Sequence, residues 1–175
     1  MKRKIVPYES LLLKPFDMWA NKWFLLAAGD FKSRKFNVMT VAWGSFGTIW
    51  NKPFAQIFVR PTRYTHEFTE NFPYFTLSAF SEKYKEELQL LGSKSGRDED
   101  KLAETGLTPE PSTKVDAPSF KEASIVLECR KIYKDEMNPK GFMNAEIMSN
   151  YPGERNFHTI YFGEILAITA SDKFV

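Results

Sequence analysis

Cysteine, histidine and long apolar runs are scarce in this sequence. Cys129 is the one cysteine among the 175 residues, so no intramolecular disulfide can form, and the strand-like run around it predicts a buried, inert thiol. The 2 histidines are far apart, and no Cys/His cluster has the spacing of metal ligands, so we expect no metal site.

The chain also lacks an apolar run of about 18 residues, the length that a membrane-spanning helix needs. Its opening "MKRKIVPYESLLLKPF" is too interrupted to supply the apolar region of a secretory signal peptide. We therefore expect a cytoplasmic protein that makes no membrane contact. The net charge is only +2 and no basic stripe is present, so we expect no nucleic-acid partner.

Apolar and aromatic side chains, by contrast, are plentiful. Hydrophobic residues make up 43% of the chain, and phenylalanine alone occurs 16 times. A chain of this length buries roughly two-thirds of its unfolded surface on folding, so its core needs neither disulfides nor a metal. We expect a single domain that spans residues 1–175.

Strand-like segments recur along the chain with short helical segments between them, and they do not alternate as regular βαβ units. This pattern favours a mainly β fold with helices, namely a β-barrel or a sandwich. Gly163 predicts a bulge or a close approach within the last strand. The predicted strands are 22–30, 36–43, 54–59, 74–80, 122–137 and 158–171; the predicted helices are 62–71, 81–92, 98–105 and 144–150; and the predicted loops include 44–53 and 107–120.

The segment 37–53, "NVMTVAWGSFGTIWNKP", begins like a strand but mixes hydrogen-bonding groups with flat apolar ones. Such a surface suits a planar heterocycle with a polar edge, and its glycines allow close backbone approach. An ordinary strand and turn with an exposed tryptophan is the alternative. The candidate ring-binding residues are Asn37, Met39, Thr40, Trp43, Gly44 and Ser45.

Two further segments carry cations and hydroxyls at positions that suit a phosphate. In "RPTRYTHE" the side chains of Arg60, Arg63, Tyr64 and Thr65 surround the start of a predicted helix, where free N–H groups gather. In "GSKSGRDEDK" a glycine-rich turn brings Ser95 and Lys101 together with other cations. A capped helix and a solvated charged loop are the alternatives. No dinucleotide-binding G-x-G-x-x-G motif occurs, so FMN fits these segments better than a dinucleotide.

Four runs in this order resemble the flavoredoxin-like group of the flavin reductase family: "NVMTVAWGSFGTIWNKP", "FVRPTRYTHEF", "SGRDEDKLAETGLTP" and "FHTIYFGEI". The resemblance covers about residues 23–168. It implies an FMN-binding split β-barrel that forms a homodimer, with FMN near the subunit interface. It also implies that the flavin ring lies along residues 37–45 and that the phosphate is held by the residues of the two cationic segments.

The resemblance further implies an oxidoreductase that passes electrons from NADH or NADPH through FMN to a small-molecule or protein acceptor. His158 opens the run in which related proteins carry a histidine near the flavin or the nicotinamide, so it is the candidate catalytic residue. Trp50 and Tyr151 are candidates for packing over the ring or at the dimer contact. The alternatives are a flavoredoxin-type electron carrier that serves a protein partner and a non-enzymatic ligand-binding module.

Overall fold

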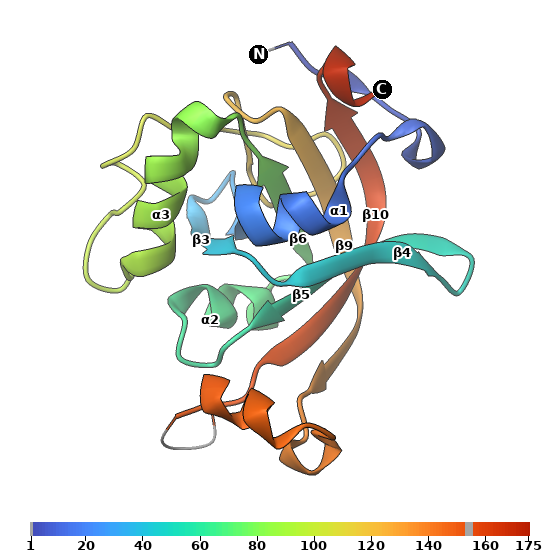
Figure 1. Ribbon diagram of the computed structural model, residues 1–175. Helices are drawn as coiled ribbons and strands as arrows, with labels where there is room; N and C mark the ends of the chain where they lie inside the picture. The colour runs from blue at the N-terminus through green and yellow to red at the C-terminus, as the bar shows by residue number, and fades with distance from the viewer. Residues whose placement is uncertain (1, 153–155) are drawn as a thin grey trace.

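Antiparallel strands dominate the computed structural model, which describes residues 2–152 and 156–175 (Figure 1). The strands are β1 (Lys4–Ile5), β2 (Phe24–Asp30), β3 (Lys35–Val41), β4 (Gly44–Ile49), β5 (Lys52–Val59), β6 (Tyr74–Ala79), β7 (Pro109–Glu110), β8 (Ser119–Phe120), β9 (Ile125–Glu136) and β10 (Thr159–Ala170). The α-helices are α1 (Pro15–Asp17), α2 (Tyr64–Asn71) and α3 (Lys85–Ser93). Short segments of other helix types are η1 (Tyr8–Ser10), η2 (Met18–Lys22), η3 (Glu82–Tyr84), η4 (Pro139–Gly141), η5 (Ala145–Asn150) and η6 (Asp172–Phe174).

The main sheet has the strand order β3-β2-β6-β9-β10-β5-β4, and β1 pairs separately with the end of β10. β7 and β8 form a small ribbon of their own. The long strands β9 and β10 pair over their whole length and connect the two halves of the sheet. The expectation of a mainly β fold with helices is confirmed.

The bend of β10 depends on a close approach at Gly163. The β9–β10 register shifts between Phe162 and Gly163, as a β-bulge produces. A Cβ atom at Gly163 would lie 2.4 Å from the ring of Phe75 and 2.8 Å from the Cβ of Cys129. Both the predicted bulge and the predicted close approach are therefore confirmed. Cys129 is fully buried, as expected, and burial together with the nearby Glu128 raises the pKa of its thiol.

Both faces of β2 are buried, which explains its uninterrupted apolar sequence. Phe24, Leu26 and Ala28 join the core inside the barrel, whereas Leu25 and Ala27 join a second cluster that includes Leu88 and Leu91 of α3. α2 and α3 both pack against β2 and β3. The two helices therefore lie beside the same two strands and bring their ends together next to β3.

Three expectations about local structure were wrong. Residues 44–49 form strand β4 instead of a loop, because Trp50 and Asn51 adopt positive φ angles of 50° and 58° and close a tight hairpin with β5. Residues 98–105 form turns instead of a helix. The segment 107–120 is not entirely loop, since β7 and β8 pair within it.

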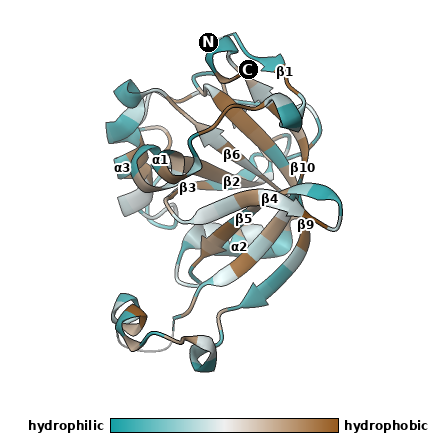
Figure 2. Ribbon diagram, turned by 45° about the vertical axis from the view of Figure 1, so that its right-hand side comes forward, coloured by the Kyte–Doolittle hydropathy of each residue, from teal (hydrophilic) through white to brown (hydrophobic). Residues whose placement is uncertain are grey.

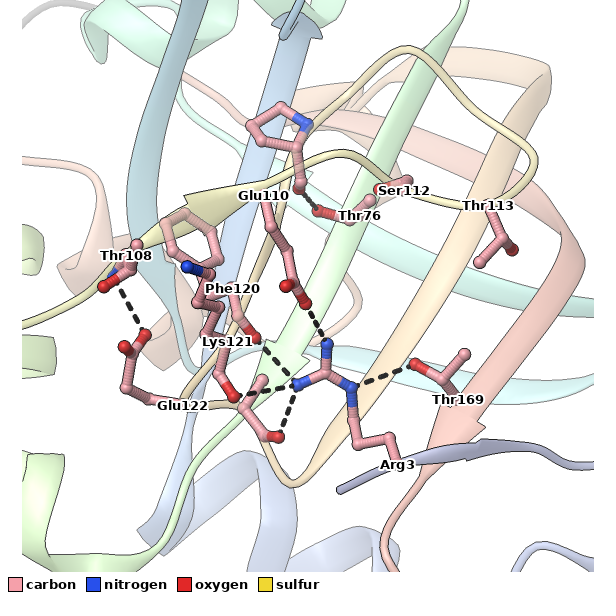
Figure 3. Close-up of polar contacts among 12 residues, drawn as sticks. Arg3, Thr76, Thr108, Glu110, Ser112, Thr113, Phe120, Lys121, Glu122 and Thr169 are labelled. Atoms are coloured by element: carbon pink, nitrogen blue, oxygen red, sulfur yellow. Dashed lines mark hydrogen bonds and ion pairs between the residues drawn. The ribbon is translucent and has the colours of Figure 1, made fainter. Parts of the chain in front are cut away.

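Arg3 fastens the N-terminal segment to the β7–β8 ribbon and to β10 (Figure 3). Its guanidinium pairs with Glu110 at 2.6 Å, donates to Thr169 Oγ1 at 3.1 Å and donates to the carbonyl of Phe120 at 2.8 Å. A further bond of 2.7 Å reaches the carbonyl of Ala123. Only 10% of the Arg3 side chain is exposed. Its contacts with Glu110, Phe120 and Ala123 hold the 107–123 segment in place.

Residues 137–152 and 156–158 project beyond the barrel at the end opposite the chain termini (Figure 2). Phe142, Tyr151 and Phe157 pack against one another within this projection, with ring centroids 4.8–5.7 Å apart. Over residues 2–152 and 156–175, no helix is long and apolar enough to cross a membrane, and no cluster of His, Cys, Asp and Glu suits a metal ion.

Candidate functional site

The phosphate-binding residues predicted from two separate segments meet at one small cavity of about 70 Å³. It lies where the N-terminus of α2, the C-terminus of α3 and strand β3 converge. The cavity is lined by Asn37, Thr62, Arg63, Tyr64, Thr65, Ser93, Lys94, Ser95, Gly96 and Lys101, and we call it the anion cradle. Its lining includes six of the twelve predicted cofactor-binding residues: Asn37, Arg63, Tyr64, Thr65, Ser95 and Lys101.

Two cations, Arg63 and Lys101, line this cradle, and neither has an acidic partner among the described residues. Lys101 is only 4% exposed, and its Nζ donates to the carbonyls of Leu91 at 2.8 Å and Lys94 at 3.0 Å. Arg63 is half-buried and donates to the carbonyl of Gly92. Among the described residues, no carboxylate forms an ion pair with either cation.

Both cations have lowered pKa values, because each is at least half-buried and lies near another cation. Burial, with a smaller contribution from Arg63, lowers the pKa of Lys101 to about 8. Burial and the nearby Arg60 lower the pKa of Arg63. Burying a charge without a counter-charge costs free energy, and a bound anion would remove that cost at both positions.

The N-terminus of α2 adds backbone donors to the same cavity. The helix begins at Tyr64, and within the described chain no side chain caps its first turn, so the free N–H groups there can reach a ligand. Asn37 Nδ2 donates to Thr65 Oγ1 at 2.9 Å, and Thr65 Oγ1 donates to the carbonyl of Val38 at 3.2 Å. These buried bonds lock α2 onto β3 and fix the cradle's geometry.

The 93–97 segment closes the cradle from the other side. Ser95 Oγ accepts from the backbone N–H of Arg97 at 3.2 Å, which stabilises the turn. A Cβ atom at Gly96 would lie 2.4 Å from Asn37 Oδ1, so glycine is needed for this close approach. The other four lining residues, Thr62, Ser93, Lys94 and Gly96, were not among the predicted cofactor-binding residues, although the glycine between Ser95 and Arg97 was a sequence signal for a tight turn.

The residues predicted to meet a flavin ring lie along β3 and at the start of β4, and their side chains differ in availability. The side chain of Met39 is buried in the core, so only its backbone is available to a ligand. Thr40 Oγ1 donates to the carbonyl of Leu88, and Ser45 Oγ donates to Gln56 Oε1 at 2.8 Å. A Cβ atom at Gly44 would clash with the ring of Trp19, which accounts for this glycine by packing within the chain.

Trp43 is different, because 48% of its surface is exposed. Its ring lies 5.2 Å from that of His158, centroid to centroid. β3 pairs only with β2 in the described part of the chain, so the strand's other edge presents backbone groups that no strand uses. An open edge that ends at an exposed tryptophan is a surface that a planar ring with hydrogen-bonding atoms can use.

Arg60 does not line the anion cradle and instead contacts the projecting segment. Its Nε donates to His158 Nε2 at 3.4 Å, and its Nη2 donates to the carbonyl of Asn150 at 2.6 Å. The guanidinium also lies 5.2 Å from the centre of the Tyr151 ring. Arg60 therefore fastens the projecting segment to the end of β5.

His158 is held as a neutral imidazole. Burial and the adjacent Arg60 lower its pKa to about 4. Because Arg60 is always a donor, Nε2 must accept and the ring proton is on Nδ1, which donates to Tyr151 Oη at 2.8 Å. Tyr151 in turn donates to Met137 Sδ at 3.1 Å. A neutral histidine with both nitrogens engaged positions Arg60 and Trp43 rather than transferring protons at neutral pH.

Known proteins resemble this chain over most of its length. An uncharacterized protein of Archaeoglobus fulgidus is 28% identical over 138 residues, which cover 79% of this chain and 67% of that protein. The structure of flavoredoxin from Desulfovibrio vulgaris (Miyazaki F) matches 99% of this chain and 78% of its own, with a TM-score of 0.67 and 26% identity.

A second solved structure agrees in fold. The FMN-binding domain of a flavin reductases-like enzyme from Shewanella baltica OS155 matches 97% of this chain and 77% of its own, with a TM-score of 0.69 and 18% identity. These similarities confirm the predicted split-barrel fold. The family model described as "Flavin reductase like domain" matches residues 23–174. The chain therefore belongs to the flavin reductase-like domain family.

Proposed function

We propose that this protein binds FMN and uses it to transfer electrons. The observation that carries the proposal is the pair Arg63 and Lys101, two cations that share the anion cradle without a carboxylate partner in the described chain. A phosphate group supplies the missing negative charge, and charge-assisted hydrogen bonds to phosphate are strong. The uncapped start of α2 adds backbone N–H groups to the same anion.

The surface that runs from the anion cradle along the edge of β3 suits the part of FMN beyond its phosphate. Asn37 lines the cradle, and Trp43 lies beyond the far end of the same strand. Between them the unpaired edge of β3 offers backbone N–H groups to the polar edge of a flavin ring, and Trp43 offers a flat apolar surface. The domain proposed to hold FMN spans residues 1–175 as one unit.

Bound FMN would supply the redox chemistry, in which hydride from NADH or NADPH enters and electrons leave to a small-molecule or protein acceptor. The chain's own residues bind and orient the cofactor. Lys101 and Arg63 hold the phosphate, and α2 and β3 fix its position relative to Trp43. His158 is neutral at pH 7, so we assign it to positioning Arg60 and Trp43.

An electron carrier that does not react with nicotinamide nucleotides is the second candidate. The 26% identity to Desulfovibrio vulgaris flavoredoxin over 99% of this chain favours it. Both candidates require FMN, and they differ in the source of the electrons.

Anaerobic reduction separates the two. The FMN-loaded protein is mixed with NADH or NADPH without oxygen, and loss of flavin absorbance is followed by stopped flow. Fast bleaching with either nucleotide, and steady nucleotide oxidation once an acceptor is added, supports the oxidoreductase. An FMN-loaded protein that neither nucleotide reduces would refute the oxidoreductase and leave the carrier.

We also propose that the protein is a homodimer, and an aromatic face supports this. Phe54, Phe162, Tyr133 and Trp50 form a chain of rings on β5, β10, β9 and the β4–β5 turn, with centroids 5.3–6.2 Å apart. Trp50 is 59% exposed and Tyr133 46% exposed. A contiguous exposed apolar face on a folded protein marks an interaction site.

The dimer proposal is tested by light scattering with size-exclusion chromatography. Tyr133→Glu places a charge within the aromatic face and is expected to yield monomers at concentrations where the unchanged protein is dimeric. Lys140→Glu is the control, because it reverses an exposed charge outside this face. A monomeric unchanged protein, or a Tyr133→Glu variant that stays dimeric, would contradict the proposal.

A further inference from the structure

A second cavity lies beside η6, at the end of the barrel where the chain termini are marked in Figure 1. Its volume is about 570 Å³, which is within the range of small-molecule sites. It is lined by residues of the segments 12–22, 80–82 and 173–174. It shares no lining residue with the anion cradle, and we call it the Phe174 cavity.

The apolar part of the lining is built on the two buried clusters of the fold. Met18 is buried in the core inside the barrel, and Phe80 is buried in the second cluster. Leu13 and Phe174 are half-buried and pack against the core inside the barrel. The backbone N–H of Leu12 donates to the carbonyl of Phe174 at 3.0 Å, which joins the 12–22 segment to η6. The apolar surface is therefore held in place before any ligand binds.

The charged part of the lining has two cations that no carboxylate compensates. Lys22 pairs with Glu82 at 2.6 Å, and Glu82, with a smaller contribution from Asp17, raises the pKa of Lys22. Both carboxylates of the lining are thus associated with the same lysine. Lys14 and Lys173 are exposed, and in the described part of the chain neither forms an ion pair with a carboxylate. A bound anion would supply the missing negative charge.

The lining distinguishes between classes of anion. Of the described residues that line the cavity, Ser81 alone is neutral and polar, so a heterocycle with several hydrogen-bonding atoms would leave most of them unpaired. A hydrocarbon chain needs no such partners, and the flexible thioether of Met18 adapts to its shape. A lysine ammonium group is a compact point charge on a flexible stem, which suits a single small anionic group. The lining therefore favours an aliphatic chain that ends in one carboxylate.

We propose that the Phe174 cavity binds a fatty acid. The hydrocarbon chain lies on Met18, Phe80 and Phe174, and the carboxylate binds Lys14 and Lys173. The inference does not depend on the flavin site, because the two cavities have no lining residue in common. A bilayer surface with anionic lipids offers similar chemistry, so the test includes vesicles.

Four variants separate the charge from the apolar contact. Lys14→Gln and Lys173→Gln each remove one exposed cation that lines the cavity. Lys83→Gln is the matched control for Lys173→Gln. Each ammonium group lies over the ring of the following residue, 4.7 Å from its centre at Lys83 and 4.6 Å at Lys173, but Lys83 does not line the cavity. Ser81→Phe fills the cavity, and the Ser81 side chain forms no capping hydrogen bond that this change would remove.

Decanoate, octanoate and 1-octanol are titrated into each purified protein by calorimetry, and circular dichroism checks that each variant is folded. The unchanged protein should bind one decanoate per chain, about 5- to 15-fold more tightly than octanoate, because each buried methylene strengthens binding up to about fourfold. Lys14→Gln and Lys173→Gln should each weaken decanoate binding about two- to fivefold and leave 1-octanol binding unchanged. Ser81→Phe should weaken binding of all three ligands at least about tenfold. Lys83→Gln should change none of them.

Three results would overturn the inference. The first is no saturable binding of decanoate by the unchanged protein. The second is an equal effect of Lys83→Gln and Lys173→Gln on decanoate binding. The third is an equal loss of decanoate and 1-octanol binding in the lysine variants, which would indicate a structural change instead of a lost contact with the carboxylate.

Vesicles of phosphatidylglycerol distinguish a free fatty acid from a lipid surface. The unchanged protein is sedimented with these vesicles in the presence and absence of decanoate. Decanoate binding without sedimentation supports the proposed site. Sedimentation with the vesicles by a protein that does not bind decanoate would assign Lys14 and Lys173 to a membrane surface and refute the proposal.

Discussion

Replacement of Lys101 by methionine should weaken FMN binding selectively. Methionine keeps most of the length and apolar volume of the side chain, which is 4% exposed, but removes the charge. One charge-assisted hydrogen bond contributes about 1.5–3 kcal/mol, so FMN affinity should fall about 10- to 150-fold. Riboflavin lacks the phosphate, and its affinity should not change. The two ligands and two proteins form a cycle that isolates the contact between Lys101 and phosphate.

The pH dependence of the same cycle gives a second readout. The pKa of Lys101 is lowered to about 8 in the free protein, and a phosphate dianion beside it raises that pKa. The bound state therefore holds more protons, and FMN affinity should fall as pH rises through about 8. The Lys101→Met variant should lack this fall, and riboflavin should not show it with either protein.

Calorimetric or fluorescence titration at several pH values measures these affinities. Lys114→Met is the matched control, since Lys114 is exposed and lines neither cavity. Equal loss of FMN and riboflavin affinity in Lys101→Met would mean that the substitution disturbs the fold instead of the phosphate contact. Unchanged FMN affinity would refute the assignment of the cradle.

Three predictions concern stability and are checked by chemical denaturation. Gly163→Ala should lower the free energy of unfolding by about 1–3 kcal/mol, because the new Cβ would lie 2.4 Å from the ring of Phe75. Gly141→Ala is the control and should lower it less, because a Cβ there would have no neighbour within 4 Å. Equal effects of the two substitutions would contradict the close packing at Gly163. Arg3→Ala should lower the free energy of unfolding by about 2–4 kcal/mol, because it removes the ion pair with Glu110 and the hydrogen bonds to two backbone carbonyls. Lys2→Ala is the control and should leave the free energy of unfolding unchanged, because Lys2 is exposed. An Arg3→Ala variant as stable as the unchanged protein would refute the role of Arg3 in holding the N-terminal segment. His158 has a folded pKa of about 4 against 6.5 unfolded, so the unfolded state takes up a proton first as pH falls. As the pH falls from 6.5 to 4, the free energy of unfolding of the unchanged protein should therefore decrease by up to about 3 kcal/mol more than that of the His158→Gln variant. Equal decreases in the two proteins would refute the assigned burial of His158.

The sequence predicted secondary structure correctly where the local pattern of apolar residues matches the side chains that the fold buries. β2 carries an uninterrupted apolar run because both its faces are covered, and α2 shows its apolar side at four-residue spacing. These signals do not depend on distant partners, so these elements were predictable. β4 was not, because Gly44 and Gly47 mimic a loop, and only the pairing with β5 holds the segment extended.

The site was predictable in its residue types but not in its geometry. Arg63 and Lys101 carried a signal as cations beside a helix start and a glycine turn, and the fold brings them to one cavity. Arg60 carried the same signal, yet its partners are His158 and Asn150, about ninety or more residues away along the chain. Met39 looked available but lies in the core. Contacts of this kind depend on tertiary packing, which residue spacing does not encode.

Binding of FMN by the anion cradle and the edge of β3 is tested most directly by one absorption spectrum. Purified protein is incubated with FMN, passed through a desalting column and scanned in the visible range. We expect flavin absorbance that elutes with the protein at close to one flavin per chain. A colourless protein after this treatment, with the fold intact by circular dichroism, would contradict it.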